Sequence, residues 1–175
     1  GGEPFLIPAH RRVWELLADR PDPPRLLITT NGTVWTDTVE WVLDRFDVDV
    51  SISVDAATAD TYAAVRRGGD FAVVQANVGR FDRALRARGR GLHVSFCLMD
   101  RNAHELAPFL RWAERFDAPA SVNLVTDVGL ALHDLATADL EAVLARWRTD
   151  PAANGLVTNA GVWATQVAQL EAVLE

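Results

Sequence analysis

Four short segments of the chain alternate between apolar and polar residues, which is typical of β-strands with one apolar and one polar face. They are residues 26–30, 48–54, 92–98 and 121–125. The longer segments between them repeat apolar residues every three or four positions, as amphipathic helices do. Strands that alternate with helices of this length predict an α/β fold built from parallel β–α–β units.

The polar positions of these segments predict an open space on one side of the sheet. Asp49, Ser51 and Ser53 alternate with valine and isoleucine, and His93 and Ser95 alternate with apolar residues in the third segment. Since the crossover helices cover the apolar face, the polar face has to line a wet or ligand-filled space. A closed barrel of eight β/α units is filled by branched apolar residues. We therefore predict an incomplete, open TIM-like (β/α) partial barrel with mostly parallel strands; an antiparallel sheet with one solvated face is the alternative.

Two predicted helix starts match the spacing of a capping box, in which the cap residue and the acidic residue three positions later satisfy free backbone N–H groups. These are Asp37 with Glu40, and Asn102 with Glu105. The last helix is expected to begin near Gly161.

Composition and charge narrow the classes of function. A length of 175 residues predicts one domain, with a partial barrel over 1–150 and a loop and helix over 151–175 that pack on it. The 24 Asp and Glu outnumber the 17 Lys and Arg, which argues against binding to nucleic acid. Cys97 is the single cysteine, so the chain cannot build a disulfide framework or supply three thiolates to a cluster. With no apolar stretch of membrane-spanning length and no leader, a cytoplasmic protein is expected.

Candidate ligand-binding residues follow the predicted strands. In parallel α/β folds the active site lies at the carboxyl ends of the strands. Thr29 and Asn31 end the first strand, and Ser53 and Asp55 end the second. These hydroxyl, amide and carboxylate groups predict a polar binding site at one edge of the sheet.

Three motifs stand at strand ends, in a fixed order along the chain. They are Gly1-Gly2-Glu3-Pro4, Ile28-Thr29-Thr30-Asn31-Gly32-Thr33 and Ser51-Ile52-Ser53-Val54-Asp55, the last followed by Arg66-Arg67-Gly68-Gly69-Asp70. The ordered set resembles the radical S-adenosylmethionine (SAM) superfamily over residues 1–150. The resemblance implies a SAM pocket at the carboxyl ends of the strands.

The resemblance also implies a role for each matching residue. The diglycine backbone and Glu3 would accept hydrogen bonds from the ammonium group of SAM, and Arg66 would bind its carboxylate. The polar residues of the strand ends would contact the methionyl and ribose groups. The implied cofactor-binding residues are Gly1, Gly2, Glu3, Thr29, Asn31, Ser53, Asp55 and Arg66.

One part of the family's pattern is absent from the sequence. The Cys-x-x-x-Cys-x-x-Cys loop, which holds a [4Fe–4S] cluster upstream of the Gly-Gly-Glu motif, has no counterpart here. We therefore expect the chain to be a piece of a longer radical SAM enzyme and to be inactive alone. The run from Tyr62 to Gly69 resembles members that modify peptides, which implies a peptide as substrate.

Two other functions remain open at this point. One is a degenerate, non-catalytic barrel module that binds a peptide or protein partner. The other is an enzyme in which Asp49, Asp55 and Asp127 hold a hard cation through carboxylate oxygens. The free edge of the first strand further predicts pairing with a second copy, and so a dimer.

Overall fold

The computed structural model describes residues 2–175 and shows an α/β fold with one parallel sheet. The sheet order is β1-β2-β3-β4, and every neighbouring pair is parallel. The strands are β1 (Leu26–Thr30), β2 (Val48–Ser53), β3 (Leu92–Leu98) and β4 (Ala120–Leu124). The predicted open partial barrel with parallel strands is confirmed, and the antiparallel alternative is wrong.

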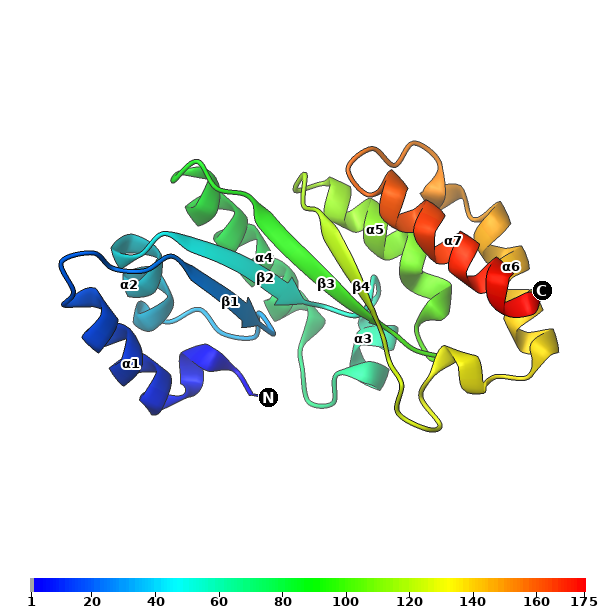
Figure 1. Cartoon of the computed structure of the whole chain (residues 1–175), viewed down its shortest axis with the longest axis horizontal. Coiled ribbons are helices and arrows are strands. Elements are labelled where there is room, and N and C mark those ends of the chain that lie inside the picture. The colour runs from blue at the N-terminus through cyan, green and yellow to red at the C-terminus, as the bar shows by residue number, and fades with distance from the viewer. Residues whose placement is uncertain (1) are drawn as a thin grey trace.

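Helices that follow β1, β2 and β3 cover one face of the sheet (Figure 1). The α-helices are α1 (Pro8–Ala18), α2 (Asp37–Arg45), α3 (Ala59–Val65), α4 (Phe71–Arg86), α5 (Leu106–Glu114), α6 (Thr137–Thr149) and α7 (Ala160–Leu174). Short 3-10 helices are η1 (Pro4–Leu6), η2 (Ala103–Glu105), η3 (Leu132–Asp134) and η4 (Pro151–Ala153). In Figure 1, α2, α4 and α5 lie behind the sheet, whereas α6 and α7 lie beyond β4. None of the helices in residues 2–175 is long and apolar enough to cross a membrane.

The core lies between the apolar face of the sheet and these helices. Val50 and Ile52 of β2 and Val94 and Phe96 of β3 are fully or almost fully buried. They belong to one hydrophobic cluster with the inner side of α4, which contributes Val74, Val78 and Phe81. Burying each such side chain stabilises the fold by roughly 1.5–3 kcal/mol. This layer fixes which side chains of each strand point away from the helices.

The opposite side of the sheet, here called the polar face, carries the polar rows predicted from the sequence. The register places Thr29 opposite Ser51, and Ser51 opposite His93. The next row places Ser53 opposite Ser95. In Figure 1, no helix of the described residues crosses in front of β2 and β3. The polar rows of consecutive strands therefore share one open face.

The two predicted capping boxes are wrong. Asp37 is the first residue of α2, whose N-cap Thr36 makes no side-chain cap. Asn102 also makes no side-chain cap at the start of η2. The side chains of Asn102 and Glu105 instead form long-range contacts with the loop after β2. These contacts satisfy backbone groups of the loop after β2, whereas a capping box would satisfy N–H groups at the start of its own helix.

Candidate functional site

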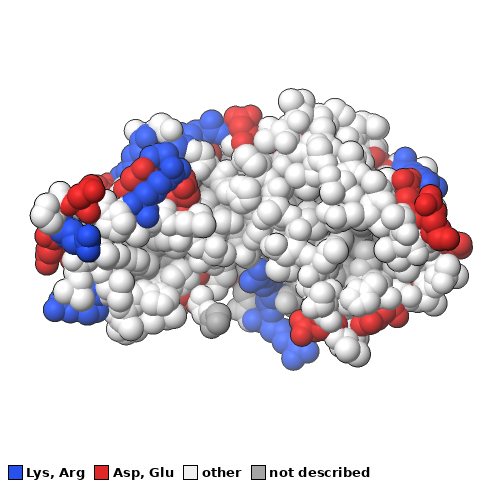
Figure 2. All heavy atoms as spheres, viewed as in Figure 1, with Lys and Arg blue, Asp and Glu red and all other residues white. Residues whose placement is uncertain are grey.

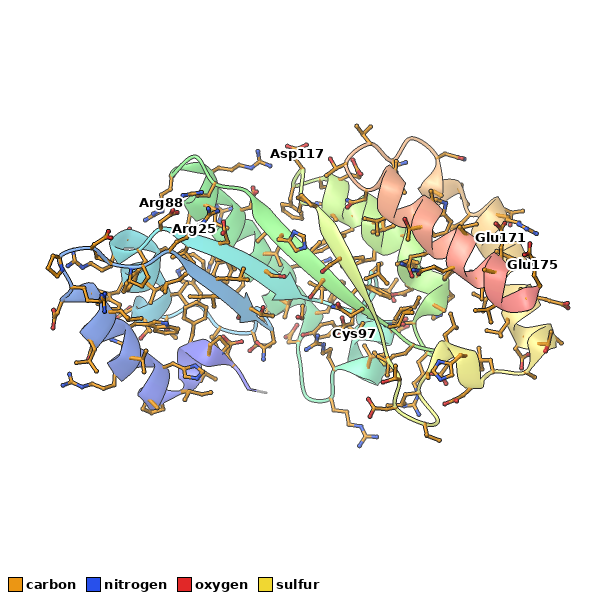
Figure 3. All side chains as sticks on the ribbon, viewed as in Figure 1. Arg25, Arg88, Cys97, Asp117, Glu171 and Glu175 are labelled. Atoms are coloured by element: carbon orange, nitrogen blue, oxygen red, sulfur yellow. The ribbon has the colours of Figure 1, made fainter. Side chains whose placement is uncertain are left out.

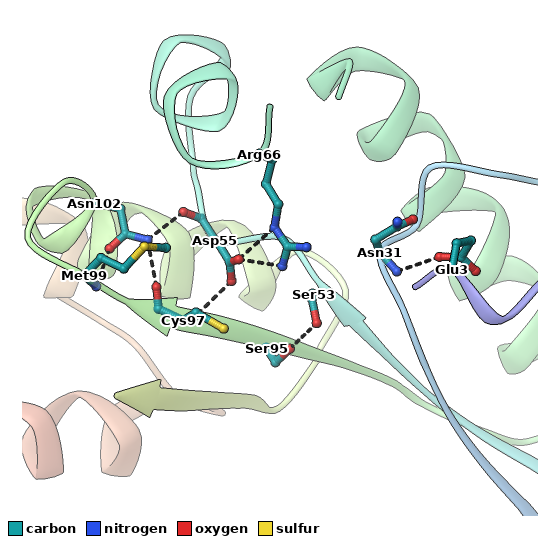
Figure 4. Close-up of polar contacts among 9 residues, drawn as sticks. All are labelled: Glu3, Asn31, Ser53, Asp55, Arg66, Ser95, Cys97, Met99 and Asn102. Atoms are coloured by element: carbon teal, nitrogen blue, oxygen red, sulfur yellow. Dashed lines mark hydrogen bonds and ion pairs between the residues drawn. The ribbon is translucent and has the colours of Figure 1, made fainter. Parts of the chain in front are cut away.

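Polar side chains gather at the carboxyl edge of the sheet, where β1, β2 and β3 end (Figure 4). The residues come from the segment before η1, the loop after β1, the ends of β2 and β3, and the turn after α3. Of the eight residues that the sequence predicts to bind a cofactor, Gly1 lies outside the described residues. Gly2 is exposed, and Thr29 is exposed on the polar face.

Glu3 fastens the amino-terminal segment to the end of β1. Its carboxylate accepts hydrogen bonds from Thr30 Oγ1 at 2.8 Å, Asn31 N at 2.9 Å and Phe5 N at 3.3 Å. Glu3 is only 7% exposed. These donors occupy most of the roughly four acceptor positions of a carboxylate. The structure thus gives Glu3 a positioning role for Asn31.

The turn after β1 presents Asn31 at the edge of the sheet. Asn31 Oδ1 accepts from Thr33 N at 2.9 Å, and Asn31 Nδ2 has no hydrogen-bond partner within residues 2–175. Gly32 has φ +69°, and a Cβ there would lie 2.8 Å from Ile52 Cγ2. A side chain at this position would be strained and would clash with the core. The sequence Asn31-Gly32 therefore holds a free amide donor beside the polar face.

Ser53 and Ser95 form a pair of hydroxyls on the polar face. Their oxygen atoms lie 2.9 Å apart, and either hydroxyl can be the donor. Ser95 is buried, whereas Ser53 is partly exposed. The pair leaves Ser53 with lone pairs and rotational freedom toward solvent.

Asp55 and Arg66 form the best-defined polar contact of the site. Asp55 Oδ2 accepts from Arg66 Nε at 2.8 Å and lies 2.5 Å from Arg66 Nη2, while Asp55 Oδ1 accepts from Cys97 N at 2.7 Å. The Asp55 side chain is 4% exposed, whereas that of Arg66 is 28% exposed. Asp55 adopts φ +65°, a left-handed conformation that aspartate tolerates better than most residues. Asp55 thus fixes the guanidinium of Arg66, which keeps further N–H donors for an anion.

Two residues whose spacing predicts only a helix cap support this edge. Asn102, which is fully buried, donates through Nδ2 to Asp55 O at 3.0 Å and to Cys97 O at 2.9 Å. Glu105 accepts from Ala57 N at 2.6 Å, from Thr58 N at 3.1 Å and from the Thr58 hydroxyl. The only signal in the sequence is the Asn-x-x-Glu spacing after the third strand, and this spacing does not identify the hydrogen-bond partners of either residue.

Burial and hydrogen bonding act in opposite directions on Glu105. Desolvation by burial favours the neutral acid, but the hydrogen bonds from Thr58 and from Ala57 N outweigh it, so the pKa of Glu105 is lowered. Glu105 is therefore ionised at neutral pH and holds the start of α3. That helix leads directly to Arg66.

The site offers no metal-binding group among the described residues. No three His, Cys, Asp or Glu side chains of residues 2–175 lie close enough together to hold an ion. Asp49 lies near the start of β2 and Asp55 beyond its end, about 20 Å apart at the rise of a β-strand. Asp49 pairs with Arg25, and Asp127 is exposed. The predicted cation site of Asp49, Asp55 and Asp127 is therefore wrong. Burial raises the pKa of the Cys97 thiol, which keeps it protonated at neutral pH.

Comparison of the sequence with known proteins identifies relatives of this chain. No family model matches it. Over 156 residues it is 32% identical to mycofactocin maturase MftC of Mycobacterium tuberculosis, in strains CDC 1551 and H37Rv. The match covers 84% of this chain and 38% of the length of each relative. MftC is a radical SAM enzyme. The chain is related to the radical SAM superfamily.

This radical SAM relationship confirms the resemblance seen in the sequence motifs. It implies SAM and a [4Fe–4S] cluster in a full-length enzyme of the superfamily. The described residues suit the first of these groups. Arg66 has free donors for a carboxylate, and Asn31 has a free amide donor. Ser53 has a hydroxyl that faces solvent at the same edge.

Proposed function

We propose that this chain is the SAM-binding portion of a radical SAM enzyme. The observation that carries the proposal is the guanidinium of Arg66, fixed by buried Asp55 at the carboxyl edge of a parallel sheet whose sequence is related to MftC. SAM bound beside a reduced [4Fe–4S] cluster would supply radical chemistry that removes a hydrogen atom from a substrate.

The residues of this chain would bind and orient SAM rather than carry out electron transfer. Arg66 would hold the carboxylate of the methionyl group with charge-assisted hydrogen bonds. Ser53 and Asn31 would hydrogen-bond neutral groups of SAM farther along the edge. Asp55 and Glu3 would keep Arg66 and Asn31 in place, since their own oxygens are already occupied by protein donors.

The chain's single cysteine has a consequence for activity. Three thiolates hold the cluster in this superfamily, and Cys97 alone cannot supply them. We propose that the cluster ligands belong to another part of a longer polypeptide and that this chain alone does not catalyse the reaction. The substrate would be a peptide, as the sequence motifs imply.

Binding of S-adenosylhomocysteine, a stable analogue of SAM, tests the proposed site. We expect Arg66→Ala to weaken binding by about tenfold or more, because a hydrogen bond to a charged group contributes roughly 1.5–3 kcal/mol. The measurement is isothermal titration calorimetry on the folded chain. The matched control is Arg67→Ala, which removes the adjacent, exposed arginine.

Two outcomes would contradict this assignment. One is equal affinity of the Arg66→Ala variant and the unchanged chain. The other is an equal loss in the Arg67→Ala variant. Circular dichroism of each variant shows whether the fold is retained, and Arg66→Lys keeps the positive charge if the alanine variant unfolds.

A non-catalytic barrel module that binds a peptide or protein is the second candidate function. The single cysteine and the open polar face favour it. Iron content and visible absorption of the anaerobically purified full-length protein separate the two candidates. Iron and a brown colour are expected for the enzyme, whereas a colourless, iron-free full-length protein would support the non-catalytic module.

A further inference from the structure

A separate hollow lies on the polar face, nearer the amino ends of the strands. Its volume is about 510 Å³, within the range of small-molecule sites. All four strands or their leading residues contribute to its lining, which includes Leu27, Thr29, Asp49, Ser51, His93 and Ser121. Figure 3 shows Arg25, which pairs with Asp49, at the opposite end of the sheet from Cys97 of the carboxyl edge.

His93 lines this hollow from β3. It lies on β3 directly opposite Ser51, and Ser51 lies opposite Thr29. Ser121 follows on β4, one row farther along the polar face. Side chains that are neighbours across strands have Cβ atoms roughly 5 Å apart, so one small ligand can reach several of them.

The imidazole of His93 is available to a ligand. It is half-buried and makes no hydrogen bond or ion pair with any other residue of 2–175. Desolvation by burial lowers its pKa, so the ring is neutral at pH 7. A neutral imidazole has one N–H donor and one nitrogen acceptor. Both are left without a protein partner here.

The charges around the hollow are compensated. The Asp49 carboxylate lies 2.7 Å from Arg25 Nη2, and Arg90, just before β3, pairs with Asp47. No titratable side chain of β1 or β4 lines the hollow. Figure 2 shows charged side chains around the rim of this view and a broad uncharged surface in its middle. The lining therefore combines hydroxyls, one neutral imidazole and apolar side chains such as Leu27, which is 78% exposed.

We propose that this hollow binds neutral amide groups, as a peptide backbone presents them, through His93, Ser51 and Ser121. An amide carries one donor and one acceptor, which the imidazole and the hydroxyls can match in either order. A ligand with a free carboxylate or ammonium group would lose hydrating water on binding. No unpaired opposite charge lines the hollow to replace that water, since the nearby charged side chains are already paired. This hollow would hold the peptide substrate of the proposed enzyme, so the inference rests on the proposed function. The experiment below measures dipeptide binding, which is separate from the S-adenosylhomocysteine binding that tests the SAM site.

Nuclear magnetic resonance of the folded chain tests the proposal with N-acetyl-Ala-Ala-amide as the probe. We expect saturable shifts of the His93 ring signal, while those of His10, His104 and His133 stay fixed. N-acetyl-Ala-Ala, with a free carboxylate, and Ala-Ala-amide, with a free ammonium, are expected to bind at least about fivefold more weakly, as loss of a hydrogen bond and unfavourable desolvation imply.

Variants identify the binding residues. His93→Gln and Ser51→Ala are each expected to weaken binding of the capped dipeptide by about fivefold, whereas His133→Gln, which changes an exposed histidine, leaves it unchanged. S-adenosylhomocysteine binding should survive His93→Gln, and dipeptide binding should survive Arg66→Ala. The proposal is overturned if the His93 signal does not move, if all four histidines move together, or if either charged dipeptide binds more tightly.

Discussion

Single carboxylates and amides connect chain segments that are far apart in sequence. Glu3, Asp55 and Glu105 each accept from backbone N–H groups of another loop or strand. A carboxylate has about four acceptor positions and can therefore receive several N–H and O–H donors at once. These three side chains thus hold together segments that meet at the carboxyl edge of the sheet.

Glu105→Gln should destabilise the chain near pH 7 by roughly 1–3 kcal/mol, because the neutral amide is a weaker acceptor for Ala57 N and for Thr58. The pKa of Glu105 is lowered in the folded state. Its contribution is therefore complete above the unfolded value, ~pH 4.3, and is lost as the pH falls through the folded value. Urea unfolding at neutral and acidic pH measures the difference, which should shrink as the pH falls.

Glu141→Gln is the matched control, since Glu141 is exposed on α6. A loss of stability in this variant equal to that of Glu105→Gln would contradict the role of the buried carboxylate. So would a Glu105→Gln effect that is the same at neutral and at acidic pH.

Secondary-structure elements are joined here by side chains as well as by packing. Asn159 precedes α7 and is fully buried. Its Oδ1 accepts from Ala120 N at 2.8 Å, and its Nδ2 donates to Ala118 O at 3.1 Å. Asn159 thus joins the start of α7 to the start of β4. These two hydrogen bonds attach the amino-terminal end of α7 to the sheet, even though the residues just before α7 form a loop.

Asn159→Ala should lower the free energy of unfolding by about 2 kcal/mol or more, because it removes two hydrogen bonds and leaves their buried backbone partners unsatisfied. Urea unfolding monitored by tryptophan fluorescence gives the value. Asn154→Ala is the control of the same residue type at an exposed position. An equal effect of the two substitutions would refute the joining role of Asn159.

The strands and their two faces were predictable from the sequence, whereas the partners of the polar groups were not. Alternation of residue type is local, so it located β2 and β3 within a residue or two and identified the polar side of Ser51 and Ser53. The partners of Asp55 and Glu105 include groups more than 40 residues away. Local spacing carries no information on such contacts, which is why the spacing of Asn102 and Glu105 predicts a helix cap and not these partners.

At the scale of the molecule, the part of the chain that the structure describes has a free sheet edge at β1. Within residues 2–175, β1 pairs only with β2, and Leu27 is 78% exposed. A groove beside this strand is lined by Pro4, His10, Val13 and Trp14. Unpaired N–H and C=O groups next to exposed apolar side chains favour pairing with another chain. We therefore still predict a dimer, with the edge of β1 and the groove beside it as the contact surface.

Sedimentation velocity over a range of concentrations tests the dimer. We expect a concentration-dependent dimer that Leu27→Lys dissociates, because a lysine on an edge strand opposes pairing. Val157→Lys, which changes an exposed valine in the loop before α7, should leave the dimer intact. A monomer at high concentration, or equal dissociation by both substitutions, would exclude pairing through β1.

The hydroxyl pair of Ser53 and Ser95 has a consequence for ligand exchange at the carboxyl edge. Each proton can rotate about its C–O bond, so Ser53 can offer a hydrogen to one ligand and a lone pair to the next while the oxygens remain in place. Reversing the direction of this bond requires no movement of either strand. In the proposed SAM site, a rigid sheet would thus present either a donor or an acceptor at the same position.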